Sequence, residues 1–117
     1  MYKIGGKVAV VDFWVSWCGP CRKEITDVLI PLYQKHGGKD FVVVGIDVSD
    51  RIPEHEKASK QLGIPYPQII DTTSFSSDHY GLQSIPQVFL IDRDGTLLGN
   101  YRGEELVREV EKALKKE

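Results

Sequence analysis

The feature that most constrains this chain is a pair of cysteines placed between an apolar run and a helix start. Cys18 and Cys21 are the only cysteines, and Gly19 and Pro20 separate them. The preceding run Val8–Trp14 is apolar with one acid inside, which predicts a buried central strand. Gly19 and Pro20 are turn and helix-start residues. The pair therefore stands where a buried strand turns into a helix. Two cysteines are too few for a disulfide framework, and burial as small hydrophobes does not suit a turn.

This placement gives the two thiols different chemistry. Cys18 is expected at the helix N-terminus, where the helix dipole and free amide groups stabilise a thiolate. Cys21 lies one turn further on and can attack a mixed disulfide formed at Cys18. Zinc binding is the competing interpretation, but a zinc site needs four ligands and the sequence has no second C-x-x-C and no H-x-x-H. We therefore expect a redox-active pair with no metal and no bound cofactor.

The composition excludes several other classes of protein. The length of 117 residues fits a single domain, residues 1–117. The net charge is −2 and the basic residues are interspersed with acids, so a nucleic-acid-binding face is not expected. No apolar run approaches the roughly 20 residues of a membrane span. The segment Tyr2–Lys7 is polar and does not resemble a signal peptide. The early first strand leaves open that an upstream segment has been removed from a longer precursor.

The pattern after the cysteines predicts one long helix with a break. Pro20–His36 carries apolar residues at helical spacing. Pro31 lacks a backbone donor, so we expect a kink or break just before it. Gly37 and Gly38 end the helix. The expected inner face consists of Ile25, Val28, Leu29, Leu32 and Tyr33.

The rest of the chain alternates strands and helices and then closes with a hairpin. Strands are predicted at Phe41–Val48, Tyr66–Ile70, Pro86–Asp92 and Thr96–Tyr101, with a turn at Arg93-Asp94-Gly95. Helices are predicted at Pro53–Leu62 and Glu104–Lys116, with a helical turn within Ser74–Tyr80. This order predicts an α/β fold with a mixed sheet and helices on both faces. Scattered in polar segments, His36, His55 and His79 are predicted to be surface residues.

The run Val11–Cys21, VDFWVSWCGPC, resembles the active-site segment of thioredoxins. Ser84-Ile85-Pro86 resembles the loop in which that fold carries a cis-proline. Within the superfamily the chain is more similar to the TlpA/ResA-like thiol-disulfide oxidoreductases. Its opening GKVAVVDFWVSWCGPCRKE, its long segment 51–85 and its closing VFLIDRDGTLLGNYRG carry this resemblance, which extends from Gly6 to the C-terminus. It implies a thioredoxin fold with a central insertion.

The resemblance also implies roles for residues around the thiols. Cys18 is the attacking thiol and Cys21 the resolving thiol. Asp12 is the proton acceptor for Cys21, with a purely structural buried acid as the alternative. Trp17 is a partly exposed platform beside the site, with an incidental surface position as the alternative.

Four further positions complete the expected site. Gly19 and Pro20 tune the redox pair toward a reductant. A cis bond at Pro86 would place the Ile85 backbone beside the thiols, where an extended substrate could add hydrogen bonds. The alternative for Pro86 is a proline that simply starts a strand.

Three features depart from the family pattern. Little chain precedes the first strand, where those proteins carry a hairpin. Thr26 stands where their active-site helix often has proline, and proline comes later, at Pro31. We therefore expect a different helix geometry, with one extra residue accommodated. Val43 replaces the lysine that thioredoxin places beside its buried acid.

The sequence thus predicts a protein-disulfide reductase acting by dithiol–disulfide exchange. A thiol peroxidase-like redoxin and a non-catalytic adaptor domain are the alternatives. The expected partners are disulfide-containing or dithiol proteins and an upstream redox partner that resets the pair. We expect a monomer. The resemblance points to an extracytoplasmic location, with the cytoplasm as the alternative.

Overall fold

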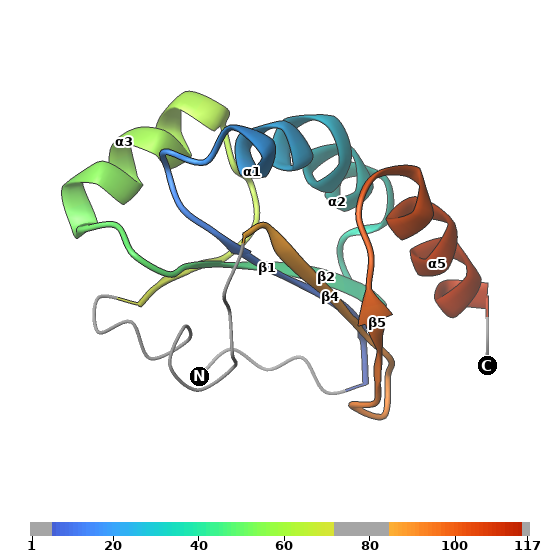
Figure 1. Ribbon diagram of the computed structural model, residues 1–117. Helices are drawn as coiled ribbons and strands as arrows, with labels where there is room; N and C mark the ends of the chain where they lie inside the picture. Colours follow the sequence, from blue (N-terminus) through green and yellow to red (C-terminus); the bar gives the residue numbers. More distant parts are fainter. Residues whose placement is uncertain (1–5, 72–84, 116–117) are drawn as a thin grey trace.

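The computed structural model of the protein describes residues 6–71 and 85–115 (Figure 1). The described part contains one mixed sheet with strands in the order β3-β2-β1-β4-β5. β1 pairs in parallel with β2 and antiparallel with β4, while β2–β3 is parallel and β4–β5 antiparallel. The expected mixed sheet is confirmed. The strands are β1 (Val8–Trp14), β2 (Phe41–Asp47), β3 (Gln68–Ile70), β4 (Gln87–Ile91) and β5 (Leu97–Asn100).

The helices among the described residues cover one face of this sheet (Figure 1). They are α1 (Gly19–Glu24), α2 (Ile30–His36), α3 (Ile52–Leu62) and α5 (Gly103–Lys115), with a π-helical segment, η1 (Ile25–Leu29), between α1 and α2. The main core lies between sheet and helices and joins alternate β1 residues, such as Val8 and Val10, to Leu106 and Val110 of α5. Of the two helical faces that were predicted, the described residues show one. The helical turn predicted within Ser74–Tyr80 lies outside the described residues.

The long predicted helix is interrupted just before Pro31. The Ile30 amide donates to the Ile25 carbonyl, five residues back, which is the bond of a π-helical turn. Pro31 follows immediately and has no amide to offer the carbonyl four residues earlier. The widened turn accommodates one extra residue ahead of the proline. The expected break and the expected insertion are therefore the same feature, η1.

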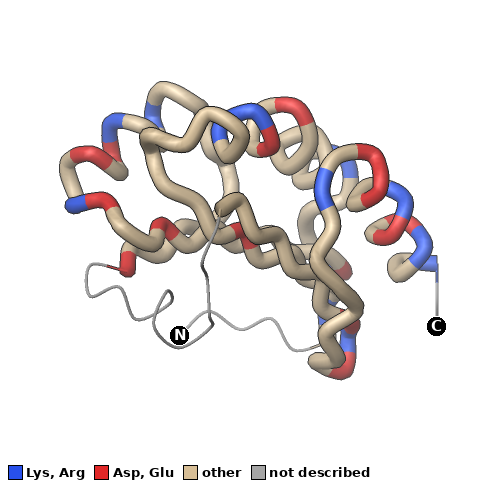
Figure 2. The backbone as a smooth tube through the Cα atoms, in the orientation of Figure 1, with Lys and Arg blue, Asp and Glu red and all other residues tan. Residues whose placement is uncertain are grey.

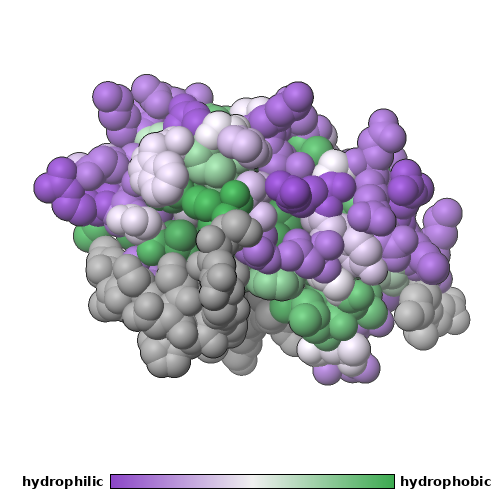
Figure 3. Space-filling view, in the orientation of Figure 1, coloured by the Kyte–Doolittle hydropathy of each residue, from purple (hydrophilic) through white to green (hydrophobic). Residues whose placement is uncertain are grey.

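The remaining elements match their predicted positions within one or two residues. α3 ends at Gly63, whose φ of +68° lies in the left-handed region that glycine tolerates best. Gly95 supplies a positive φ of +91° in the hairpin between β4 and β5. Exposed Leu97 belongs to this hairpin, over which Figure 3 shows a hydrophobic patch, whereas the helical layer is mostly hydrophilic.

Candidate active site

The cysteine pair lies at one edge of the sheet, at the carboxyl end of β1. Four residues lead from Trp14 at the end of that strand to α1, and the Cys18 amide closes a turn by donating to the Val15 carbonyl at 3.2 Å. Cys18 is the N-cap of α1, and its Sγ accepts a hydrogen bond from the Cys21 amide at 3.2 Å. The helix N-terminus therefore points a backbone donor at the Cys18 sulfur, which is the arrangement that stabilises a thiolate.

Cys18 and Cys21 are joined as a disulfide, with their Cα atoms 5.2 Å apart. The two residues differ in access, because Cys18 is 7% exposed and Cys21 is fully buried. An incoming thiolate or disulfide therefore reaches Cys18 first. The roles of attacking thiol for Cys18 and resolving thiol for Cys21 require an asymmetry of this kind and stay predictions.

The other residues of the motif line the rim of the site. Trp17 is 72% exposed, more than the partial exposure that was predicted, whereas Trp14 is fully buried in the core. Gly19 and Pro20 are exposed at the start of α1. A groove of about 290 Å³ contains Trp17 and Arg22 on one side and Lys57 of α3 on the other. A second groove of about 380 Å³ begins at Pro20 and reaches Arg102.

Ile85 and Pro86 lie at the same edge of the sheet. Phe13 of β1 is paired with Gln87 of β4, so the residues just before β4 lie beside the end of β1. The Ile85–Pro86 peptide bond is cis. Pro86 is buried, and partly buried Ile85 packs against the core cluster that contains both cysteines.

Asp12 is fully buried on the helical side of β1. The alternation along the strand puts it on the same face as Val10 and Trp14, beneath α1. Among the described residues, no group donates a hydrogen bond to either Asp12 oxygen. Burial raises the pKa of Asp12 well above its ordinary value, and the nearby Glu24 carboxylate raises it further. Asp12 is thus a buried acid that holds its proton far more strongly than an exposed aspartate.

Glu24 is a member of this site that the sequence analysis missed. Its two carboxylate oxygens accept the Gly103 amide at 3.0 and 3.3 Å, which ties α1 to the start of α5. Burial raises the pKa of Glu24, while the Gly103 amide and Arg102 oppose that rise. Its position three residues after Cys21 was the available signal, because residues three apart share a helix face.

A buried histidine, His55, lies behind the segment that leads from Trp14 to α1, and its position corrects one prediction. His55 was predicted to be a surface residue, but it is 4% exposed. Its Nδ1 lies 2.8 Å from Asp47 Oδ2, and its ring packs at 5.4 Å from the Trp14 ring. The polar composition of α3 concealed that one side of the helix faces the sheet. His36, in contrast, is partly buried, and its Nε2 lies 3.1 Å from Glu111 Oε2. His79 lies outside the described residues.

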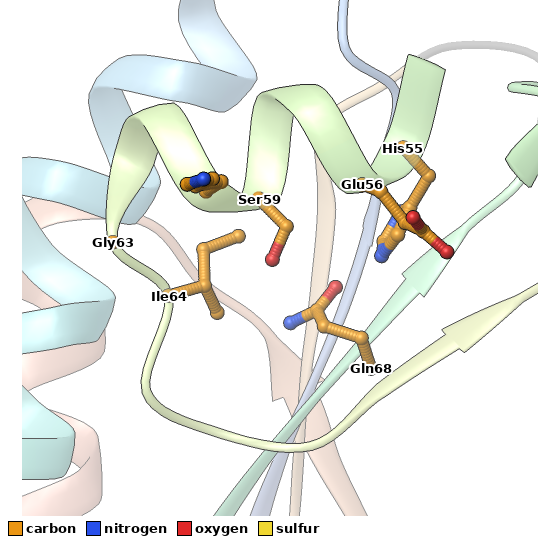
Figure 4. A pocket seen from close by; sticks show the side chains of 7 residues that line it. His55, Glu56, Ser59, Gly63, Ile64 and Gln68 are labelled. Atoms are coloured by element: carbon orange, nitrogen blue, oxygen red, sulfur yellow. The ribbon is translucent and has the colours of Figure 1, made fainter. Parts of the chain in front are cut away.

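Trp14 is held from another direction by Gln68 of β3. The Trp14 Nε1–H donates to Gln68 Oε1 at 3.0 Å, across the intervening strand β2. Gly45 of β2 makes this possible, because a Cβ there would collide with the Gln68 amide. Gln68 and His55 also line a groove of about 590 Å³ between α3 and β3 (Figure 4).

No group of three or more histidine, cysteine or acidic side chains is arranged to hold a metal within residues 6–71 and 85–115. In the same ranges no helix is both long and apolar enough to cross a membrane. Both α3 and α5 carry acidic as well as basic residues (Figure 2).

Comparisons with known proteins agree with this geometry. The Redoxin family model matches residues 2–115. The thiol-disulfide oxidoreductase ResA of Bacillus thuringiensis subsp. konkukian is 32% identical over 111 residues, which are 95% of this chain. The chain spans 64% of the length of that relative.

Two solved structures share the fold. The thioredoxin domain of a thiol-disulfide oxidoreductase from Bacteroides vulgatus has a TM-score of 0.86 and 27% identity, covering 96% of this chain and 82% of that one. A thioredoxin-family thiol:disulfide interchange protein from Chlorobium tepidum has a TM-score of 0.80 and 32% identity, covering 95% and 82%. The fold is therefore the thioredoxin fold, as the resemblance implied.

Proposed function

The chain belongs to the redoxin family, and from this membership we propose that it is a thiol-disulfide oxidoreductase that reduces disulfides in other proteins. The observation that carries the proposal is the asymmetry of the pair. Cys18 is the more accessible of the two, at a helix N-terminus with an amide directed at its sulfur, and Cys21 is fully buried within reach of it. A dithiol exchange needs one thiol that attacks the substrate disulfide and a second, close to the first, that resolves the mixed disulfide.

The reaction consists of two exchanges. The Cys18 thiolate attacks one sulfur of the substrate disulfide; the substrate S–S bond breaks and one substrate sulfur leaves as a thiolate. The Cys21 thiol then loses its proton and attacks the Cys18 sulfur of the mixed disulfide, which releases the second substrate thiolate. Both substrate thiolates take up protons. Two electrons have passed to the substrate, and the Cys18–Cys21 disulfide must be reduced by a dithiol redox partner before the next cycle.

Asp12 is the proton acceptor for Cys21 in this proposal. It lies beneath the helix that carries Cys21, and its raised pKa brings it closer to that of a thiol than an exposed aspartate would be. Glu24 influences Asp12 through its charge.

The substrate would meet the protein along the rim formed by Trp17 and the segment at Ile85–Pro86. Exposed Trp17 offers an apolar contact surface, and the Ile85 backbone can pair with an extended segment. The proposed substrates are therefore disulfide-containing proteins, met by a monomer. We place this activity outside the cytoplasm, where disulfides persist.

Two variants test the assignment. Cys18→Ser should abolish reduction of insulin disulfides, while Cys21→Ser should accumulate a mixed disulfide between Cys18 and substrate. A wild-type rate of insulin reduction by Cys18→Ser would contradict the proposal. Peroxide consumption without insulin reduction would instead favour a thiol peroxidase, and absence of any reversible disulfide would favour an adaptor domain.

The reduction potential of the pair decides the direction of electron flow. A value near −270 mV, about that of thioredoxin, supports a reductant, whereas a value near −120 mV, about that of a strong oxidant, contradicts the proposed direction. Equilibration with glutathione or dithiothreitol buffers, followed by thiol alkylation, measures it.

A further inference from the structure

The turn that presents Cys18 is held at its second residue by a buried acid from the segment between β2 and α3. We call Val15–Cys18 the active-site turn, since the Cys18 amide donates to the Val15 carbonyl. Within it, the Ser16 amide donates to Asp50 Oδ2 at 2.7 Å, and the Ser16 hydroxyl donates to Asp50 Oδ1 at 2.8 Å. Both Asp50 oxygens thus bind one residue of the turn. The Ser16 carbonyl in turn accepts the Arg22 guanidinium of α1 at 2.9 Å.

Asp50 is itself fixed by its neighbours beyond the end of β2. It is 6% exposed, and its amide donates to Asp47 Oδ1 at 3.0 Å. Asp47 Oδ2 lies against His55, which packs on Trp14 at the end of β1. We call Asp47, Asp50 and His55 the buried acid–histidine cluster. It joins the end of β2, helix α3 and the end of β1 behind the active-site turn.

The two carboxyl groups of this cluster are unequal. Burial raises the pKa of Asp47 to about 6, and the hydrogen bond that it shares with Asp50 adds to the rise. Burial also acts to raise the pKa of Asp50, but hydrogen bonds from Asp47 and from the Ser16 amide and hydroxyl outweigh it and lower the pKa. Asp50 therefore ionises at lower pH than Asp47, and charged acceptors make the stronger hydrogen bonds.

Building on the proposed function, we propose that Asp50 is a positioning residue of the redox centre, which through Ser16 holds Cys18 at the amide groups of α1. In the disulfide form the S–S bond already ties Cys18 to Cys21. In the dithiol form that bond is gone, and the place of the Cys18 sulfur depends on the active-site turn. The hydrogen bonds to Asp50 thus matter most in the state that attacks substrate.

Removing them should weaken the contact between the Cys18 thiolate and the helix N-terminus. The pKa of the Cys18 thiol then rises, and the thiolate fraction at neutral pH falls. If the pKa of the Cys18 thiol rises by about one unit, its thiolate fraction at pH 7 falls up to tenfold. A thiolate of higher pKa is also a better nucleophile, which offsets part of that loss. The net result is that Cys18 attacks about threefold more slowly at pH 7. Asp50 also contributes a negative charge that opposes the thiolate, so charge and geometry must be separated.

Asp50→Ala and Asp50→Asn together make that separation. Both remove the charge, but asparagine can still accept the Ser16 amide, whereas alanine cannot. In the reduced protein with Cys21→Ser, alkylation of Cys18 by iodoacetamide is followed from pH 4 to pH 9. Asp50→Ala should shift the Cys18 profile to higher pH than Asp50→Asn does, and react about threefold more slowly at pH 7. The charged groups facing the turn from α1 and α3, Arg22, Glu54 and Lys57, are unchanged.

Ser16→Ala provides a variant that folds even if the cluster does not tolerate alanine. It keeps the Asp50 charge and the amide bond but loses the hydroxyl bond, so its profile should shift in the same direction by a smaller amount. Glu56→Ala, which removes an exposed acid from the outer groove of α3, is the matched control and should leave the profile unchanged.

The outcomes are distinct. The inference is overturned if Asp50→Asn and Asp50→Ala have the same pH profile of Cys18 alkylation and Ser16→Ala has the profile of the wild type. Asp50 then does not position Cys18. If Asp50→Ala does not fold, a wild-type profile for Ser16→Ala alone overturns it. Failure of the proposed function shows separately, as a wild-type protein that reduces no insulin, whatever the variants do.

Discussion

The buried acid Asp12 should make the stability of this protein depend on pH in a way that one substitution removes. Asp12→Asn keeps the shape of the side chain but cannot ionise. Below about pH 3.9, the ordinary pKa of aspartate, Asp12 is protonated in both the folded and unfolded chains. Above that pH the unfolded chain loses the proton, while the folded chain keeps it because its pKa is raised. The unfolded state is therefore increasingly favoured as pH rises.

The size of the effect follows from the proton difference. While Asp12 is protonated only in the folded chain, the wild type should lose about 1.4 kcal/mol of unfolding free energy per pH unit relative to Asp12→Asn. This loss of unfolding free energy stops growing at the pH where Asp12 ionises in the folded chain. Above that pH the difference between the two proteins is constant, and the pH at which this plateau begins measures the pKa of folded Asp12. Urea unfolding at intervals from pH 4 to pH 8 gives the two curves, and their difference cancels other titrating groups such as Asp47.

Parallel stability curves for the wild type and Asp12→Asn would refute this reasoning. Asp40→Asn, at an exposed acid before β2, is the matched control and should run parallel to the wild type. Because the Glu24 charge raises the pKa of Asp12, repeating the comparison in a Glu24→Gln background should bring the plateau to lower pH. An unmoved plateau would show that Glu24 does not act on Asp12.

Three further predictions concern packing, and urea unfolding measures each. Gly45→Ala displaces the Gln68 amide and breaks its bond with Trp14, which should cost about 1 kcal/mol, and the cost should shrink if Gln68 is first changed to alanine. Gly63→Ala should cost about 1 kcal/mol through backbone strain alone, because its Cβ would meet open space; no loss would contradict the left-handed conformation. Leu106→Ala leaves a cavity in the core and should cost about 2–5 kcal/mol, and a smaller loss would mean that the core collapses around it.

Local patterns in the sequence were sufficient for the elements and for the central pair. A buried strand followed by C-G-P-C and a helix start determines its own geometry, because strand burial, turn residues and helix capping act over a few neighbouring residues. Pro31 likewise predicted the break in the helix, because the missing amide is a property of that residue alone. The burial of Trp14 followed from its place at the end of the strand, and the exposure of Trp17 from its place in the turn after it.

The residues that surround the cysteine pair could be identified only from the tertiary structure. Asp50 and Ser16 are 34 residues apart, and Trp14 and Gln68 are 54 apart, so no local pattern connects them. They meet because the parallel pairing of β1 and β2 brings the carboxyl ends of both strands to one edge of the sheet. His55 was misjudged for the same reason. Its own helix is polar, and only the packing of α3 against that edge buries its ring. The sequence by itself determined which residues can react, whereas the pairing of distant strands decided which groups hold those residues in place.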